Sequence, residues 1–245
     1  MDAKYKFELK EVVFGSKENN NRIQKLLKDG TIRKISSRIY TTNFDDKPEE
    51  IIKRNILEII GNLFPNSILS HRSAFEFEPT KDNYLFVTYK YTKLLKLPGI
   101  TISFIKGSSP IKGDNRFIGE LFVSQKPRAF LENLQISKGL GGKNKTLPIP
   151  LIEEKLDKII TVKGEEGIND LRDEAKKIAS KLNLKKEFEK LNRIISALLS
   201  TKPSKILNSE LGIARALKAP FDKSRLELLK ILFNELSNGE FELIP

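Results

Sequence analysis

The segment S-K-G-L-G-G-K-N-K-T, residues 137–146, comes close to a phosphate-binding loop. Counted from Gly139 it reads G-x-x-x-x-N-K-T, so Asn144 replaces the second glycine of the nucleotide-binding pattern. A true phosphate loop follows a buried strand and opens a helix. Here residues 128–134 before the loop have helical spacing, and the prolines of Leu147-Pro148-Ile149-Pro150 after it argue against a direct continuation as a helix. We therefore interpret the loop as a mobile basic connector that makes a secondary contact with an anion through Lys138, Lys143 and Lys145.

His71 is the only histidine and lies in L-S-H-R-S-A. A catalytic role requires an acid or a nucleophile beside it, which a single sequence does not show. We interpret Ser70 as the cap of a short helix that carries His71 and Ala74 on its inner side, with His71 buried and hydrogen-bonded. Arg72 is a further candidate for the secondary anion contact, and an ion pair is the alternative.

Composition bears on several other kinds of site. The chain has no cysteine, which excludes disulfides, thiolate metal sites and cysteine nucleophiles. Acidic residues between 153 and 174 alternate with basic ones, as in D-E-A-K-K at 173–177, a pattern typical of surface ion pairs. We expect no metal, no cofactor and no catalytic residue, and hence a protein that is not an enzyme.

The charge balance favours a polyanionic partner. Forty-four Lys and Arg against 32 Asp and Glu give a net charge of +12. Such a bias is typical of proteins that bind nucleic acid or an anionic surface, although compositional bias alone also produces it. No apolar run reaches membrane-spanning length, and the first residues do not form a secretory signal. We expect a cytoplasmic protein without membrane contact.

The most informative elements lie near the N-terminus. Ser16 is a candidate N-cap for a helix that runs to about Lys28, with Ile23 at the centre of its apolar stripe. Residues 31–42 follow as two β-prone runs around a polar turn, which predicts a hairpin. A helix followed directly by a basic hairpin is the second half of a winged helix-turn-helix. The alternatives are a packing unit with a solvated basic face and a protein-interaction module, and only about fifteen residues precede the helix.

In a winged helix the helix enters the major groove of DNA and the hairpin, or wing, lies along the backbone. Basic residues on such elements contact phosphates, whereas an amide side chain can read a base edge. Asn21 is therefore our candidate for a base contact. The candidate phosphate contacts are Lys17, Lys25, Lys28, Arg33, Lys34 and Arg38.

The remaining chain changes character near Pro148-Ile149-Pro150. Before it, residues 84–89 and 100–105 read as strands between turn signals. After it, residues 151–160, 168–182, 188–199 and 226–236 have helical spacing. We predict an α+β fold with a winged-helix-like element at 1–44, an α/β domain at 45–147 and an α-helical domain at 148–245.

A family resemblance accompanies these patterns. The run from L-L-K-D-G-T-I-R-K-I-S-S-R-I-Y-T-T to L-S-H-R-S-A-F-E-F-E-P-T resembles the AbiEi-type antitoxins of bacterial abortive-infection systems. It is still more similar to the region that precedes the catalytic core in a group of Fic-family proteins. That similarity extends through R-A-F-L-E-N-L, the glycine loop and G-E-E-G-I-N-D-L-R-D-E-A-K-K-I-A-S-K-L, and so covers most of the chain.

The resemblance implies one of two functions. An AbiEi-type protein is an antitoxin and transcriptional repressor that binds double-stranded promoter DNA and opposes a toxin. The Fic relatives transfer AMP through an H-P-F-x-x-G-N-G-R motif, which this sequence lacks. The alternative is thus a non-catalytic regulatory or targeting region of a Fic-family AMP-transferase, acting on a Fic-type protein partner. The resemblance leaves homo-oligomers open. Arg38 stands where the family often has a glycine at the hairpin turn.

Overall fold

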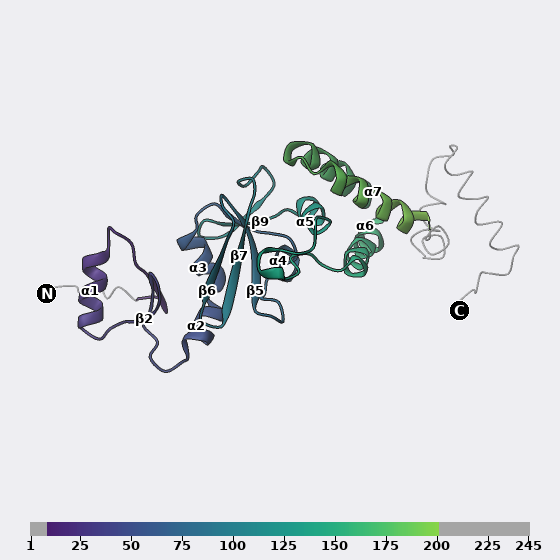
Figure 1. Cartoon of the computed structure of the whole chain (residues 1–245). Coiled ribbons are helices and arrows are strands. Elements are labelled where there is room, and N and C mark those ends of the chain that lie inside the picture. Colours follow the sequence, from purple (N-terminus) through teal and green to yellow (C-terminus); the bar gives the residue numbers. More distant parts are fainter. Residues whose placement is uncertain (1–8, 201–245) are drawn as a thin grey trace, which may run out of the picture. The chain divides into compact units, whose positions relative to one another are not determined.

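The computed structural model describes residues 9–200, and its helices and strands give an α+β fold (Figure 1). Within these residues the chain forms two compact units. The first runs to Ile152 and includes Asp170–Leu191, and the second includes Glu153–Asn169 and continues from Asn192. The helix predicted at 226–236 lies outside the described residues.

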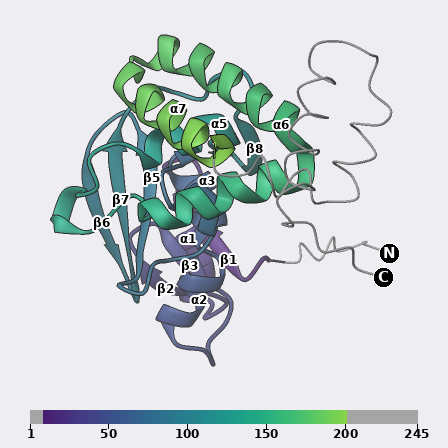
Figure 2. The same ribbon diagram turned by 90° about the vertical axis from the view of Figure 1, so that its right-hand side faces the viewer.

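The described part of the chain begins with strand β1 (Val12–Phe14), helix α1 (Asn20–Lys28) and strands β2 (Arg33–Ser36) and β3 (Ile39–Thr41) (Figures 1 and 2). We call residues 12–41 the helix–hairpin element. Its three strands pair antiparallel in the order β1-β3-β2. The predicted helix and hairpin are both present. Strand β1 was not predicted from the sequence. Among the described residues α1 is the only helix before the hairpin.

Helix α1 begins three residues later than the capping prediction placed it, with Asn19 instead of Ser16 as the residue before the helix. The Ser16 hydroxyl accepts a hydrogen bond from the Asn19 backbone N–H at 3.3 Å, and the Asn19 side-chain oxygen accepts one from the Ser16 N–H at 2.7 Å. This is the reciprocal arrangement of a capping box, with Asn19 in the place usually taken by Glu or Gln. Residues 17–19 form a turn, so Ser16 organises the entry to α1 although regular helix starts at Asn20.

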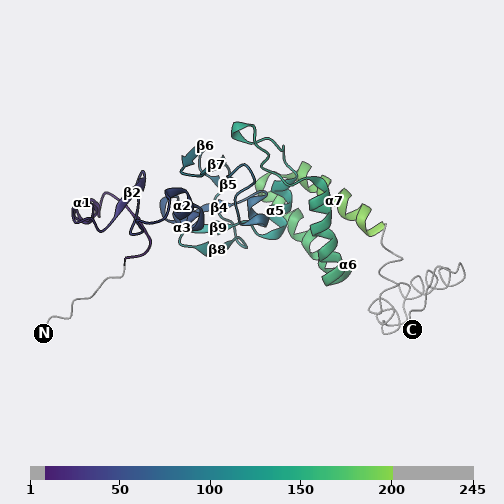
Figure 3. The same ribbon diagram turned by 90° about the horizontal axis from the view of Figure 1, so that it is seen from below.

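A mixed six-stranded sheet forms the centre of the first unit. Its strands lie in the order β6-β7-β5-β4-β9-β8. Figure 3 shows them in a row, with helices α2 (Pro48–Arg54) and α3 (Ile56–Leu63) on one face and α5 (Lys126–Asn133) on the other. The strands are β4 (Ser67–Leu69), β5 (Tyr84–Tyr89), β6 (Lys93–Leu97), β7 (Ile100–Lys106), β8 (Asn115–Ile118) and β9 (Leu121–Val123). The strands predicted at 84–89 and 100–105 are confirmed as β5 and β7.

One hydrophobic core joins the sheet to the helix–hairpin element. Isoleucines of α2 and α3, among them Ile52 and Ile59, are fully buried against sheet residues such as Val87. Val12 of β1 and Ile39 of β3 belong to the same core. Burial of branched aliphatic side chains is the main favourable term in folding, so the N-terminal element depends on the sheet and its helices for stability.

Two helices complete the described chain, α6 (Ile149–Leu182) and α7 (Lys185–Ser200). Gly164 interrupts α6 with a left-handed φ of 71°, between the two helices predicted at 151–160 and 168–182. Helix α6 starts at Ile149 and holds Pro150 in its first turn, where the missing N–H costs nothing. The expectation that the proline-rich segment does not continue as a helix is therefore wrong at its last two residues. Among residues 9–200 no helix is long and apolar enough to span a membrane.

Candidate nucleic-acid interface

Helix α1 presents a polar face of the predicted composition. Ile23 is buried, and Asn21, Lys25 and Lys28 are exposed on the side away from it, at i, i+4 and i+7. Neither lysine has an ion-pair partner within the described residues. The face therefore carries two uncompensated positive charges and one free amide.

The hairpin contributes two further exposed cations, Lys34 on β2 and Arg38 in the turn. Arg38 has a left-handed φ of 62°, and its Nε donates to the Gly15 carbonyl at 3.3 Å. A residue with a Cβ pays about 1–2 kcal/mol for this conformation, which explains why glycine suits the position. The turn thus keeps the left-handed geometry that glycine would adopt and gains a guanidinium.

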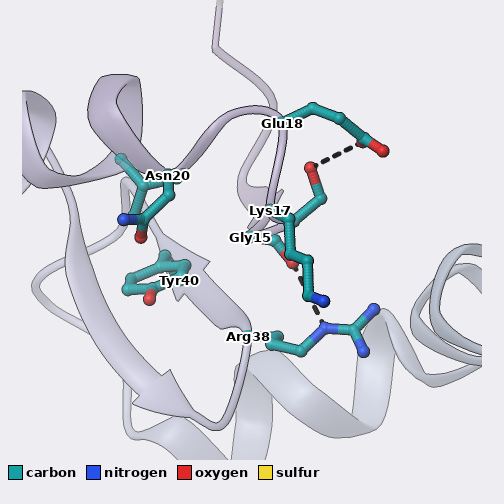
Figure 4. Close-up of a pocket in the computed structure, with 8 residues that line it drawn as sticks. Gly15, Lys17, Glu18, Asn20, Arg38 and Tyr40 are labelled. Carbon is teal, nitrogen blue, oxygen red and sulfur yellow. Dashed lines mark hydrogen bonds between the residues drawn. The ribbon is translucent and has the colours of Figure 1, made fainter.

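A hollow of about 630 Å³ separates the entry to α1 from the hairpin (Figure 4). Figure 4 shows Lys17 and Arg38 on one side and Asn20 beside Tyr40 on the other. Lys17, the Asn20 amide and the Tyr40 hydroxyl have no partner within the described residues. The lining is Gly15, Ser16, Lys17, Glu18, Asn20, Ile23, Arg38 and Tyr40.

Sequence reasoning named Lys17 and Arg38 but missed Asn20 and Tyr40. Strand alternation was the available signal for Tyr40, because Ile39 and Thr41 are buried and the residue between them faces the other side. Asn20 gave no such signal, since only the position of the hairpin places it on the hollow.

Arg33 has a structural role that the sequence did not indicate. Its Nε donates to the Asn43 carbonyl at 2.9 Å, and its terminal nitrogen donates to the Asp46 carbonyl. The guanidinium also lies 5.8 Å from the centre of the Phe44 ring. Arg33 thereby fixes the turn between the hairpin and α2, and we leave it out of the interface proposed below.

The glycine loop, which we expected to be a mobile connector, is joined by hydrogen bonds within itself. Lys138 and Asn144 form a β-bridge, the Gly139 N–H donates to the Lys143 carbonyl at 2.8 Å, and the Lys145 N–H donates to the Ser137 carbonyl at 2.9 Å. Helix α5 precedes the loop, as its spacing predicted, so the strand that a phosphate loop requires is absent at this point of the structure.

The four candidates for the secondary anion contact differ in availability. Lys138 is exposed, whereas Lys143 pairs with Asp82 at 3.1 Å and Lys145 donates to the Gln135 side chain at 3.3 Å. Arg72 forms a two-fold hydrogen-bonded pair with Glu76, both bonds being 2.7 Å, which is the ion pair we had given as the alternative. Of the four, only Lys138 has neither an ion pair nor a side-chain hydrogen bond within the described residues.

His71 is buried and hydrogen-bonded, as predicted. Its Nε2 lies 3.2 Å from the Gln135 amide oxygen, so Nε2 carries the proton and Nδ1 accepts from the Ser70 hydroxyl at 2.9 Å. Burial lowers the pKa of the imidazole to about 4. The cap prediction is wrong, because the Ser70 hydroxyl bonds to His71 and Thr88 and the helix nearby, α4 (Ser73–Glu76), starts later.

A buried ion cluster lies beside His71. Arg128 bonds to Glu132 at 2.8 Å and pairs with Asp114, and Glu132 also accepts from the Ser124 hydroxyl at 2.8 Å and from the His71 backbone N–H at 3.2 Å. Arg128 is 1% exposed, so these charges hold the loop before β8, the end of β9 and α5 together away from solvent. Within residues 9–200 no three His, Asp or Glu side chains gather as a metal site would require.

No protein-family model matches the chain, and no curated protein matches it. The similarity to AbiEi-type antitoxins and to the Fic-associated region therefore stays a prediction from the residues quoted above. What the geometry provides is a basic helix–hairpin element with a hollow lined by both polar and apolar groups between the entry to α1 and the hairpin.

Proposed function

We propose that this protein is a regulator that binds double-stranded DNA through its helix–hairpin element. The observation that carries the proposal is the charge balance of this element, since residues 12–41 hold seven Lys and Arg but only two Asp and Glu. Lys17, Lys25, Lys28 and Lys34 are exposed and have no ion-pair partner within the described residues. Exposed lysines also occur elsewhere in the first unit, among them Lys93 and Lys96 of β6, so the local excess of cations and not the lack of ion pairs distinguishes this element.

Unpaired cations on one element favour a polyanion. Nearby carboxylates neutralise a cation and leave it less able to bind phosphate, whereas an uncompensated lysine releases counterions from DNA when it binds. The excess of basic over acidic residues on α1, its entry and the hairpin therefore supports a binding surface on this element.

The dimensions of the element agree with this role. Helix α1 has nine residues and is therefore about 14 Å long, which suits a major groove about 12 Å wide. In our proposal Asn21 faces the base edges, while Lys25 and Lys28 contact phosphates at the edges of the groove. Lys34 and Arg38 on the hairpin then reach the neighbouring backbone.

The biological role that we propose is that of an antitoxin-type transcriptional regulator. This part rests on the resemblance of residues 26–80 to AbiEi-type antitoxins, in which such an element binds promoter DNA. The rival function, a regulatory region of a Fic-type AMP-transferase that acts through protein contacts, predicts no appreciable DNA affinity.

The test is a salt titration of DNA binding. We expect the wild type to bind a labelled 30-base-pair duplex, and the double variant Lys25→Ala with Lys34→Ala to bind it more weakly. The slope of log affinity against log salt should fall in magnitude by about 2, since each lost phosphate contact removes about 0.9. Anisotropy measured between low and physiological salt gives both quantities.

The matched control is Lys93→Ala with Lys96→Ala, which removes the same charge from two exposed lysines of β6. This variant should keep the wild-type slope. An equal loss in both double variants would mean that net charge alone drives binding, and the absence of wild-type binding at low salt would overturn the proposal.

A further inference from the structure

We propose that the hollow between α1 and the hairpin holds a single nucleotide that is not stacked in a duplex. This inference rests on the proposed DNA binding and names the unit that this part of the surface recognises. Its lining combines the two kinds of group that such a unit requires, cations for the phosphate and an aromatic ring with an amide for the base and sugar.

In this proposal Lys17 and Arg38 form the side of the hollow that binds the phosphate of the nucleotide. Lys17 has no partner within the described residues, and Arg38 uses only Nε in its bond to Gly15, which leaves its two terminal nitrogens available. A guanidinium and an ammonium on one side of a cavity suit a phosphate monoester or diester. Glu18 also lines the hollow, but its carboxylate accepts from the Ser16 hydroxyl at 3.1 Å (Figure 4).

The base end is set by Tyr40 and Asn20, which lie together in Figure 4. The Asn20 amide offers a donor and an acceptor, the Tyr40 hydroxyl offers one of each, and none of these is used within the described residues. Aromatic rings bind unstacked bases by stacking, which a paired base inside a helix does not permit. A hydrogen-bonding site that is unpaired in the free protein and lies beside a ring is therefore directed at an exposed base.

The volume of the hollow favours a nucleotide over a simple anion as its ligand. A hollow of about 630 Å³ lies within the range of roughly 300–1,000 Å³ that small-molecule sites occupy, and a phosphate ion alone would leave most of it empty. Gly15 allows the Tyr40 ring to lie close to the backbone at this side of the hollow, because a Cβ there would stand 3.0 Å from the ring.

The experiment compares three probes on wild type, Asn20→Ala and Tyr40→Phe. The probes are a fully paired duplex, the same duplex with one unpaired central nucleotide, and a mixture of the four deoxynucleoside monophosphates. We expect the wild type to prefer the duplex with the unpaired nucleotide. Each variant should reduce that preference about fivefold, the value of one lost hydrogen bond, while its affinity for the paired duplex stays unchanged.

Gln24→Ala is the matched control, since Gln24 is exposed on the same helix but does not line the hollow. Equal wild-type affinity for both duplexes, together with no binding of the monophosphates, would overturn the proposal, as would a preference that both variants retain. Monophosphate binding that Asn20→Ala abolishes, without a duplex preference, would support the hollow with a free nucleotide as its ligand. If neither duplex binds but the monophosphates do, the DNA-binding proposal fails and the nucleotide site stands.

Discussion

At the scale of single residues, Arg38 combines an unfavourable backbone conformation with a positively charged side chain. Its left-handed φ of 62° is costly for any side chain with a Cβ, and its guanidinium lines the hollow. Strained residues are retained where a surrounding structure or a function requires them. Substitutions at Arg38 can therefore separate the free-energy cost of its backbone conformation from the contribution of its side chain to DNA binding.

We expect Arg38→Gly and Arg38→Ala to differ in stability but to agree in DNA binding. Both remove the guanidinium, so both should weaken DNA binding to the same extent. Only glycine relieves the left-handed strain, and the glycine variant should be more stable than the alanine variant by about 1 kcal/mol. Urea unfolding of the two proteins measures the difference, and equal midpoints would show that the turn is unstrained.

The second prediction at the scale of single residues concerns His71, which should make the stability of the protein sensitive to acid. Burial lowers its pKa from 6.5 to about 4, so between these values the unfolded chain binds a proton that the folded protein excludes. The free energy of unfolding should therefore fall by roughly 3 kcal/mol as the pH falls from about 6.5 to about 4. In His71→Asn, which tolerates the left-handed φ of 53°, this component of the pH dependence should vanish. Urea midpoints across this pH range test it, and identical slopes for both proteins would contradict it.

At the scale of elements, the entry to α1 depends on Asn19. Its side chain accepts from the Ser16 N–H and donates to the Phe14 carbonyl at 2.8 Å, which ties the end of β1 to the start of the helix. The neighbouring Asn21 is exposed and makes no such bond. Two asparagines of one segment therefore have distinct roles.

Asn19→Ala should lower the free energy of unfolding by about 1 kcal/mol, the usual cost of a lost capping interaction. Asn21→Ala should leave stability within about 0.5 kcal/mol of wild type, as exposed substitutions do, and should instead weaken DNA binding. Denaturant unfolding and anisotropy on both variants provide the comparison. The assignment of Asn21 is wrong if its replacement leaves DNA affinity unchanged.

At the scale of the whole molecule, the helix–hairpin element is part of a larger folded unit. Val12 and Ile39 share the core of the central sheet, and Glu11 accepts hydrogen bonds from Arg54 and Asn55 next to α2. The hydrogen bond from Arg54 lowers the pKa of Glu11 to about 2. The predicted boundary at residue 44 thus crosses a continuous core within one compact unit.

The stability of that unit should depend strongly on Arg128. Arg128→Leu leaves Asp114 and Glu132 buried without their cation, and we expect a loss of roughly 3–5 kcal/mol. Arg116→Leu, which breaks an exposed pair with Glu120, should cost less than about 1 kcal/mol. Thermal and urea unfolding compare the two, and similar losses would show that burial of the Arg128 cluster carries no penalty.

The sequence by itself determined the local elements near the DNA-binding candidate. The apolar spacing around Ile23, the turn at residues 36–38 and the basic residues around them predicted a helix, a hairpin and their exposed charges. Each of these features depends on residues that are a few positions apart in the sequence. The spacing of apolar residues shows which of these neighbours lie on the same face of a helix or strand.

Only the tertiary structure decided what these side chains contact. Arg33 and Lys34 are adjacent in sequence, yet one fixes a turn and the other is exposed, because residues 43–46 fold back over Arg33. The hollow exists because the hairpin brings Arg38 and Tyr40 beside the entry to α1. Such contacts join residues distant in the chain, and no local pattern encodes which side chains will meet.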